Sequence, residues 1–205
     1  MQSRSASDSI PLAARSVRAL AVEAWRRAAA MGLVDTASAP LETADVTRLL
    51  RRVRDAGIAR GPALRFDNVE PPSVGEAESL LRLVIAALDA SPVPHFEWPA
   101  VSRVLEPEQL AALVNVSVSS LRRYFSGERA TPDDVAARLH HVALVVGDLV
   151  GAYNEVGVRR WFERRRTALD GRAPAALLSG DWNPDDPSPQ KVRELARSLV
   201  ALSAT

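Results

Sequence analysis

The sequence predicts an all-α protein, a helical bundle, and three observations support this. Apolar residues recur every three or four positions along most of the 205 residues, which is the period of an amphipathic helix. Segments with this spacing begin at capping residues or prolines and end at glycines, as helices do. With 47% apolar residues, the chain can also bury a substantial core between such helices.

Apolar stripes predict three helices in the N-terminal half of the chain. Their buried faces are expected over residues 17–28, 46–53 and 77–88. The third helix begins with a capping box, because the side chains of Ser73 and Glu76 can each bond to the other's backbone N–H. Between the second and third helices, residues 57–73 contain glycines and prolines and predict a long loop, with at most a short strand over 63–66.

A second link is expected at residues 91–99, where prolines interrupt the helical spacing. The chain is therefore expected to divide there, and residues 1–98 form an N-terminal helical region whose role the sequence does not indicate. The remainder is expected to comprise two regions with different motifs, residues 99–156 and residues 157–205.

Residues 106–132 have the pattern of a helix-turn-helix. Pro107 can open the first helix at a position where its missing N–H costs nothing. The turn that follows, Asn-Val-Ser at residues 115–117, has an asparagine that tolerates a left-handed backbone and a serine that can cap the next helix. Gly127 is expected to end that second helix.

The second helix of this motif has two different faces. Its inner face is expected to bury Leu121 and either Tyr124 or Phe125. Its outer face carries hydroxyls at the start and arginines one turn later, a combination suited to phosphate contacts and to reading guanine in the major groove. The residues expected to bind DNA are Ser117, Ser119, Ser120, Arg122 and Arg123. The same pair of helices can instead have a purely structural use, and both interpretations stay open.

Three more helices are expected after this motif. Residues 131–134 combine a capping threonine, a proline and two acids, and they begin a nearly all-apolar helix that is expected to be central and buried. His140 and His141 lie on it and are expected to be core or surface residues rather than metal ligands. A further helix is expected over residues 157–169, and the last begins near Ser188-Pro189 with an apolar face from Val192 to Val200.

The composition excludes several classes of function. The chain has no cysteine, and its three histidines are too scattered for a convincing metal site. It lacks a Gly-rich phosphate loop and the HExxH and GxSxG motifs, so we expect neither an enzyme nor a cofactor. No apolar run is long enough to cross a bilayer, and the polar N-terminus lacks the apolar core of a signal peptide, so a cytoplasmic protein is expected.

The net charge of +1 shows that the chain is not basic as a whole. Positive charge is nevertheless unevenly distributed, with a cluster of arginines that comprises Arg159, Arg160, Arg164, Arg165 and Arg166. Such a cluster can contact phosphate groups, or it can be a solvated helix face paired with neighbouring acids. Both interpretations stay open.

From Glu106 onward, the order of motifs resembles the Xre/MbcA/ParS-type antitoxins, in which a helix-turn-helix region precedes a small toxin-binding domain. The family's C-terminal pattern is an aromatic-rich helix, a leucine-glycine turn, a proline, paired leucines and a final helix. These positions here are Trp161 and Phe162, Leu169 with Gly171, Pro174, Leu177 with Leu178, and residues 192–199. The chain departs from the family in its expanded GDWNPDDPSPQ segment and in its long N-terminal region.

The resemblance implies an antitoxin of a type II toxin-antitoxin system, which neutralises an NAD-consuming toxin of the RES fold. It also implies that the chain binds operator DNA as an autorepressor, for which a homodimer on a palindromic site is expected. The residues expected to bind the toxin centre on a turn that should be exposed between helices: Trp161, Pro174, Leu177, Leu178, Ser179, Gly180 and Trp182. Two alternatives stay open, a helix-turn-helix transcriptional regulator without a toxin and a protein-interaction module that uses the motif as a scaffold.

Overall fold

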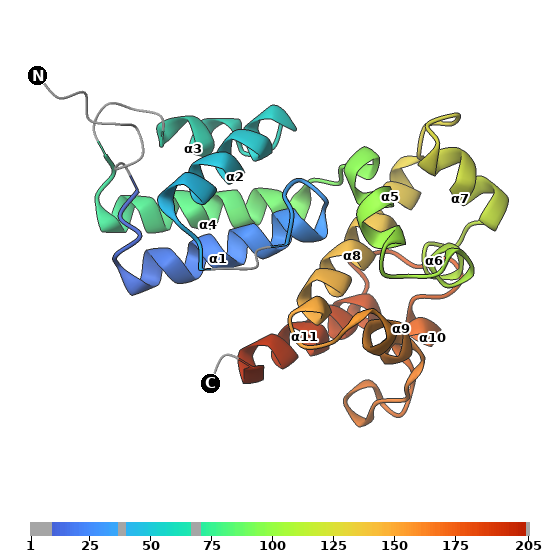
Figure 1. The fold of residues 1–205 in the computed structure, drawn as a ribbon. Coiled ribbons are helices and arrows are strands. Elements are labelled where there is room, and N and C mark those ends of the chain that lie inside the picture. The colour runs from blue at the N-terminus through green and yellow to red at the C-terminus, as the bar shows by residue number, and fades with distance from the viewer. Residues whose placement is uncertain (1–9, 37–39, 67–70, 204–205) are drawn as a thin grey trace, which may run out of the picture. The chain divides into compact units, whose positions relative to one another are not determined.

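The computed structural model describes residues 10–36, 40–66 and 71–203, with side chains as far as residue 199. In these ranges every regular element is a helix, apart from one isolated bridge between Arg166 and Arg172 (Figure 1). The predicted all-α fold is therefore confirmed. None of the helices in the described ranges combines the length and the apolar composition that a membrane crossing requires.

The chain forms two compact units. Unit 1 comprises Met1–Ala29 and Leu33–Ser91, and unit 2 comprises Ala30–Gly32 and Pro92–Thr205. The division at residues 91 and 92 differs from the expected one at residues 98 and 99, which falls inside a helix. The region expected to begin at residue 157 is not a separate unit, because its helices share one hydrophobic core with those before it.

The helices of unit 1 bury the apolar faces that their sequences predict. They are α1 (Arg15–Ala30), α2 (Thr43–Asp55), α3 (Arg60–Arg65) and α4 (Val74–Ala90). Half of the expected capping box is seen at α4, because the Ser73 side chain accepts a hydrogen bond from the backbone N–H of Glu76 at 3.3 Å, whereas the Glu76 side chain binds Arg65 at 2.7 Å. The buried Arg27 of α1 binds Asp89 of α4 at 2.8 Å, so an ion pair joins the first and last helices of the unit.

The loop and short strand expected over residues 57–73 are wrong where α3 forms. Ala63 and Phe66 are three positions apart, so a helix places them on one face whereas a strand would place them on opposite faces. Both side chains are buried, and α3 packs against α2 and α4. The chain enters this helix through Ala59, which has a left-handed backbone with a φ of 45°.

The helices of unit 2 surround one long central helix, α8. In chain order they are α5 (Pro94–Ser102), α6 (Pro107–Leu113), α7 (Val118–Phe125), α8 (Asp133–Val150), α9 (Glu155–Glu163), the 3-10 helix η2 (Thr167–Leu169), α10 (Pro174–Leu177) and α11 (Pro187–Ser203). Helix α8 is buried along almost its whole length, with α5 and α11 packed against it. The central buried helix that the sequence predicts is confirmed. Val200, which was expected on the apolar face of α11, lies outside the described side chains.

Helix α5 replaces the link that was expected at residues 91–99. Pro94 occupies the first turn, where no N–H is required, and Pro99 lies inside the helix. Glu97 and Val101 are one turn apart and, with Trp98, they are buried. Since short helices are stable mainly through packing, burial against α8 explains a helix that two prolines hide from sequence-based prediction.

Helix α9 is shorter than the helix expected over residues 157–169. It ends at Glu163, and residues 164–172 form a tight hairpin closed by the bridge between Arg166 and Arg172. At the tip of the hairpin, Asp170 and Gly171 have φ values of 55° and 74°. A helix cannot continue through left-handed residues, so the expected helix terminator at Asp170-Gly171 instead reverses the chain.

We predict that Phe162→Ala lowers the free energy of unfolding by about 3–5 kcal/mol. The Phe162 ring is fully buried and packs edge-on against Trp161, with ring centroids 5.3 Å apart. The matched control is Phe125→Ala, because the Phe125 side chain is half exposed and its loss should cost no more than about 1 kcal/mol. Urea unfolding measures both variants, and equal losses would contradict this description of the core.

Candidate functional site

A tight turn joins α6 to α7 as the sequence predicts. Asn115 has a left-handed backbone with a φ of 57°. The Ser117 side chain caps α7 by accepting a hydrogen bond from the backbone N–H of Ser120 at 3.1 Å. Val116 between them packs partly against the core. After α7, Gly127 takes a φ of 75° and ends the helix.

The inner face of α7 is held against α5. Leu121 and Tyr124 are buried, whereas Phe125 is exposed, which decides between the two aromatic residues considered from the sequence. Trp98 of α5 stacks on Tyr124 with ring centroids 6.0 Å apart and an angle of 18° between the planes. The indole N–H of Trp98 also donates a hydrogen bond to Thr131 Oγ1 at 3.0 Å, so the segment after α7 is tied to the same tryptophan.

The outer face of α7 presents three of the five residues that were expected to bind DNA. Ser119, Arg122 and Arg123 have the spacing of a single helix face and are exposed. Ser117 is exposed and Ser120 is half buried, and the Ser117 hydroxyl lies 3.0 Å from those of Ser119 and Ser120. In the described part of the chain neither arginine is paired with a carboxylate. The structure therefore brings hydroxyls and uncompensated cations together on one surface.

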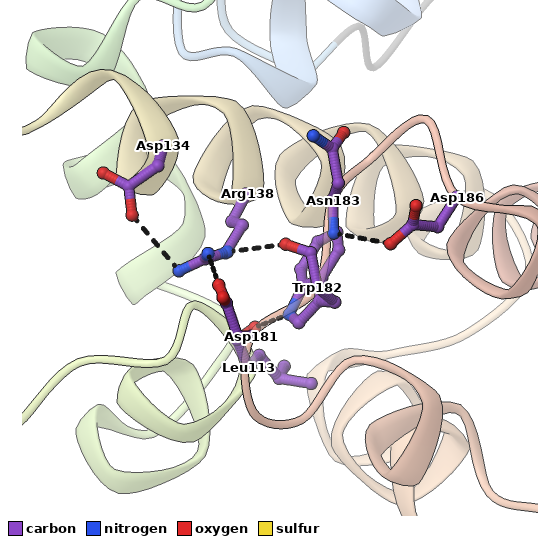
Figure 2. A network of polar contacts seen from close by, with 7 residues as sticks. All are labelled: Leu113, Asp134, Arg138, Asp181, Trp182, Asn183 and Asp186. Atoms are coloured by element: carbon purple, nitrogen blue, oxygen red, sulfur yellow. Dashed lines mark hydrogen bonds and ion pairs between the residues drawn. The ribbon is translucent and has the colours of Figure 1, made fainter.

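A buried arginine on α8 fixes the turn that precedes α11 (Figure 2). Arg138 donates hydrogen bonds to the backbone oxygen of Trp182 at 2.8 Å and to Asp181 Oδ1 at 2.6 Å. Asp134, one turn earlier on α8, contacts the same guanidinium at 3.4 Å. The Trp182 indole N–H donates to the backbone oxygen of Leu113 at 3.0 Å, so the turn is also bonded to the end of α6. We call these contacts the Arg138 clamp.

Hydrogen bonds within the expanded GDWNPDDPSPQ segment hold the turn that leads into α11. The Asp186 side chain accepts a hydrogen bond from the backbone N–H of Asn183 at 3.0 Å (Figure 2). Asn183 Oδ1 accepts one from the N–H of Asp185 at 2.9 Å. Asp181, Asp185 and Asp186 are all exposed, yet Asp181 and Asp186 also have hydrogen-bonding partners within the chain. Across the described residues no group of three His, Cys, Asp or Glu side chains is arranged to hold a metal ion.

Most of the residues expected to bind a toxin belong to the core of unit 2. This buried set comprises Trp161, Pro174, Leu178 and Trp182. The expectation that the turn from residue 174 to residue 182 is exposed is therefore wrong for Pro174, Leu178 and Trp182, whose side chains are buried within their own chain. Leu177 is half buried, and of the expected residues only Ser179 and Gly180 are exposed. At this turn a partner protein can reach Ser179 and Gly180 together with the exposed Ala176 and Asp181.

A buried acid–histidine pair between α5 and α8 was not expected from the sequence. Glu97 is completely buried, and its Oε1 lies 2.6 Å from His140 Nδ1. Burial raises the pKa of the Glu97 carboxyl above its usual value, and the contact with His140 opposes that rise. The pair was missed because Glu97 falls in a segment that prolines made look like a link.

The neighbouring His141 faces α11 and is also buried. Burial lowers its pKa to about 3, and the positive charge of Arg193 acts in the same direction. The imidazole ring packs edge-on against Trp182, with ring centroids 5.3 Å apart. His141 is thus a neutral core residue at pH 7.

Comparison of the chain with protein-family models, with curated protein sequences and with solved structures yields no match. The arguments for its function therefore depend on the geometry of unit 2 and on the order of motifs along the sequence.

We predict that acid weakens the fold through His141. Its pKa in the folded chain is about 3, below the ordinary 6.5, so the unfolded chain binds the proton more readily. The contribution of neutral His141 to the free energy of unfolding is fully present above pH 6.5. It falls as the pH drops from 6.5 towards 3, by at most about 1.4 kcal/mol per pH unit.

Urea unfolding of wild type and His141→Gln over this pH range measures the effect. Glutamine cannot take up the proton, so the variant should lose less stability on acidification than the wild type does. His95→Gln is the control, because His95 is exposed. An unchanged pH dependence in His141→Gln would contradict the prediction.

Proposed function

We propose that unit 2 binds duplex DNA through α7. The observation that carries this proposal is the division of α7 into two faces. Leu121 and Tyr124 fix the helix to α5, whereas Ser119, Arg122 and Arg123 are exposed and free of carboxylate partners in the described part of the chain. A recognition helix needs this combination, a rigid support on one side and polar groups able to reach base edges and phosphates on the other.

The charge of this surface predicts how the DNA is bound. From Ser117 to Arg129 the chain carries three arginines and only one acid, Glu128. Two or three phosphate contacts give weak binding, and one short helix reads few base pairs, so a homodimer on a palindromic site fits best. The two recognition helices would then enter the major groove about one helical turn apart, roughly 34 Å. If the α6–α7 pair is instead purely structural, no duplex should bind through this face.

We predict that Arg122→Ala combined with Arg123→Ala weakens duplex binding and flattens its salt dependence. Each phosphate contact contributes about 0.9 to the slope of log affinity against log salt, so the loss of two contacts should reduce the slope by up to about 1.8 per chain. Fluorescence anisotropy over a range of salt concentrations measures both quantities. Arg103→Ala is the control, an exposed arginine of unit 2 outside α7. Unchanged affinity and slope in the double variant would show that α7 is not the recognition helix.

We further propose that the chain is an antitoxin, and that it neutralises an NAD-consuming toxin of the RES fold and represses its own operator. Two observations support this function, the order of motifs from Glu106 to the last helix and the rigidity of the turn at Ser179-Gly180. Leu178 on one side of this turn is fully buried, and Trp182 on the other is held by the Arg138 clamp. A turn that is already ordered loses little conformational entropy when a partner binds, which favours its use as a contact.

We predict that Ser179→Trp weakens binding to the toxin encoded beside the chain by roughly tenfold or more, since a bulky ring at the exposed turn keeps the two surfaces apart. Co-expression with that toxin tests protection of the cells, and an assay of the purified pair tests affinity. Ser198→Trp is the matched control, because Ser198 is an exposed serine on α11. Deleting the residues after Val156 would be a poorer test, since α9 and α11 contribute to the core.

Protection by Ser179→Trp equal to that of the wild type would contradict the role of the turn. Absence of a neighbouring toxin gene, together with operator binding, would instead favour a transcriptional regulator that acts without a toxin.

A further inference from the structure

Positive charge in this chain is concentrated in residues 159–172. This segment has six arginines against two acids, Glu163 and Asp170, so it carries a charge of +4. The whole chain carries only +1, and the remaining residues therefore carry −3. A local excess of this size in a nearly neutral chain is the electrostatic pattern of a surface that binds anions.

The structure holds four of these arginines on an ordered loop, residues 164–172, which we call the arginine hairpin. The backbone N–H groups of Arg166 and Gly171 donate hydrogen bonds to the backbone oxygens of Arg172 and Arg166, each at 3.0 Å. The Arg166 guanidinium lies over the ring of the buried Trp161, 5.4 Å from its centroid. Because the backbone is fixed in this way, its side chains can bind an anion at little cost in backbone entropy.

Three arginines of this segment have no carboxylate partner in the described part of the chain. Arg160, Arg164 and Arg165 are all exposed. In contrast, Arg159 binds Glu106 at 2.6 Å, and Lys191 lies 3.9 Å from Asp170. The excess charge is therefore presented to solvent rather than neutralised within the protein.

The hairpin and the recognition helix are linked through the helices that lie between them, α9 and α6. Helix α9 is bonded to α6, because Gln109 Nε2 donates to the backbone oxygen of Arg159 at 3.0 Å. Figure 1 shows α7, α6, α9 and the hairpin following one another from top to bottom in the right-hand part of the picture. Duplex DNA carries one charge per about 1.7 Å, so a duplex seated on α7 continues past its neighbours with phosphates at every step.

We propose that Arg160 and the arginine hairpin bind the phosphate backbone of the duplex beside the site contacted by α7. This inference rests on the proposed binding of DNA by α7 and adds a second, sequence-independent contact to it. Guanidinium groups bind phosphate oxygens through paired hydrogen bonds. The segment from residue 157 to residue 172 has no large exposed apolar side chain, and protein interfaces depend on such anchors. The surface thus fits a polyanion better than it fits a protein.

The test compares full-length wild type with a triple variant, Arg160→Gln, Arg164→Gln and Arg165→Gln. The probe is a labelled duplex of mixed sequence, about 24 base pairs or roughly two helical turns long. Fluorescence anisotropy over a range of salt concentrations should show that the slope of log affinity against log salt is shallower by up to about 2.7 in the triple variant. The affinity of the triple variant at low salt should be lower by at least about tenfold. A second triple variant with lysine at the same positions keeps the charge and should retain most of the slope. Melting curves check that all variants are folded, and single glutamine variants replace the triple one if it is not.

The possible outcomes separate this inference from the proposed function. A wild type that binds no duplex contradicts DNA binding itself. A wild type that binds, with an unchanged slope and affinity in the glutamine variant, overturns only the inference about the hairpin. An unchanged slope together with weaker protection against the neighbouring toxin would overturn it too, since it would assign the arginines to an acidic protein partner. The inference is supported when the glutamine variant loses slope and the lysine variant retains it.

Discussion

The burial of α8 is the constraint on which unit 2 depends. A helix that is buried on nearly all sides must be covered by several neighbours, and each polar group on it must find a partner away from water. Arg138 meets the turn before α11, His140 meets Glu97 of α5, and Asp148 lies 3.8 Å from Arg197 of α11. Apolar packing alone would permit many arrangements around α8. Directional polar contacts at three positions along the helix select the arrangement that is observed.

The support of α7 follows from this arrangement. At eight residues, α7 is far too short to be stable by itself in water. Its stability comes from Trp98, whose place is fixed because the adjacent Glu97 is bonded to α8. Since packing on one face is sufficient, the residues on the other face contribute little to the fold. They can therefore be chosen for recognition, and hydroxyls and arginines there cost the protein little stability.

Features that depend on neighbouring residues could be predicted from the sequence, and features that depend on distant ones could not. The left-handed Asn115 and the Ser117 cap follow from local chemistry, and the structure has both. Helices α3 and α5 were missed because glycines and prolines lower helix propensity. In the folded chain, burial of Phe66 and Trp98 stabilises these two helices despite that low propensity.

Contacts that are distant in the sequence also decide which side chains are buried in the turn from residue 174 to residue 182. Leucines and tryptophans beside a turn are the residue types of an interface and also of a core, and their composition does not separate the two. Trp182 belongs to the core because Arg138, 44 positions away, and Leu113, 69 positions away, bond to it. No pattern in the sequence around residue 182 indicates either contact. The exposure of Ser119, Arg122 and Arg123 could be predicted, because helix periodicity places these residues away from the buried Leu121.

The bond between the Trp182 indole and the Leu113 backbone has a consequence for how such a protein can evolve or be engineered. It joins the end of α6 to the turn that precedes α11, so the two halves of unit 2 are not exchangeable modules. A chimera that takes residues after 156 from a homologue without this tryptophan would leave the buried Leu113 oxygen without a donor, a loss of about 1–3 kcal/mol. Recombination at this point is therefore disfavoured, and changes in what unit 2 binds are expected to arise through point substitutions on its exposed faces.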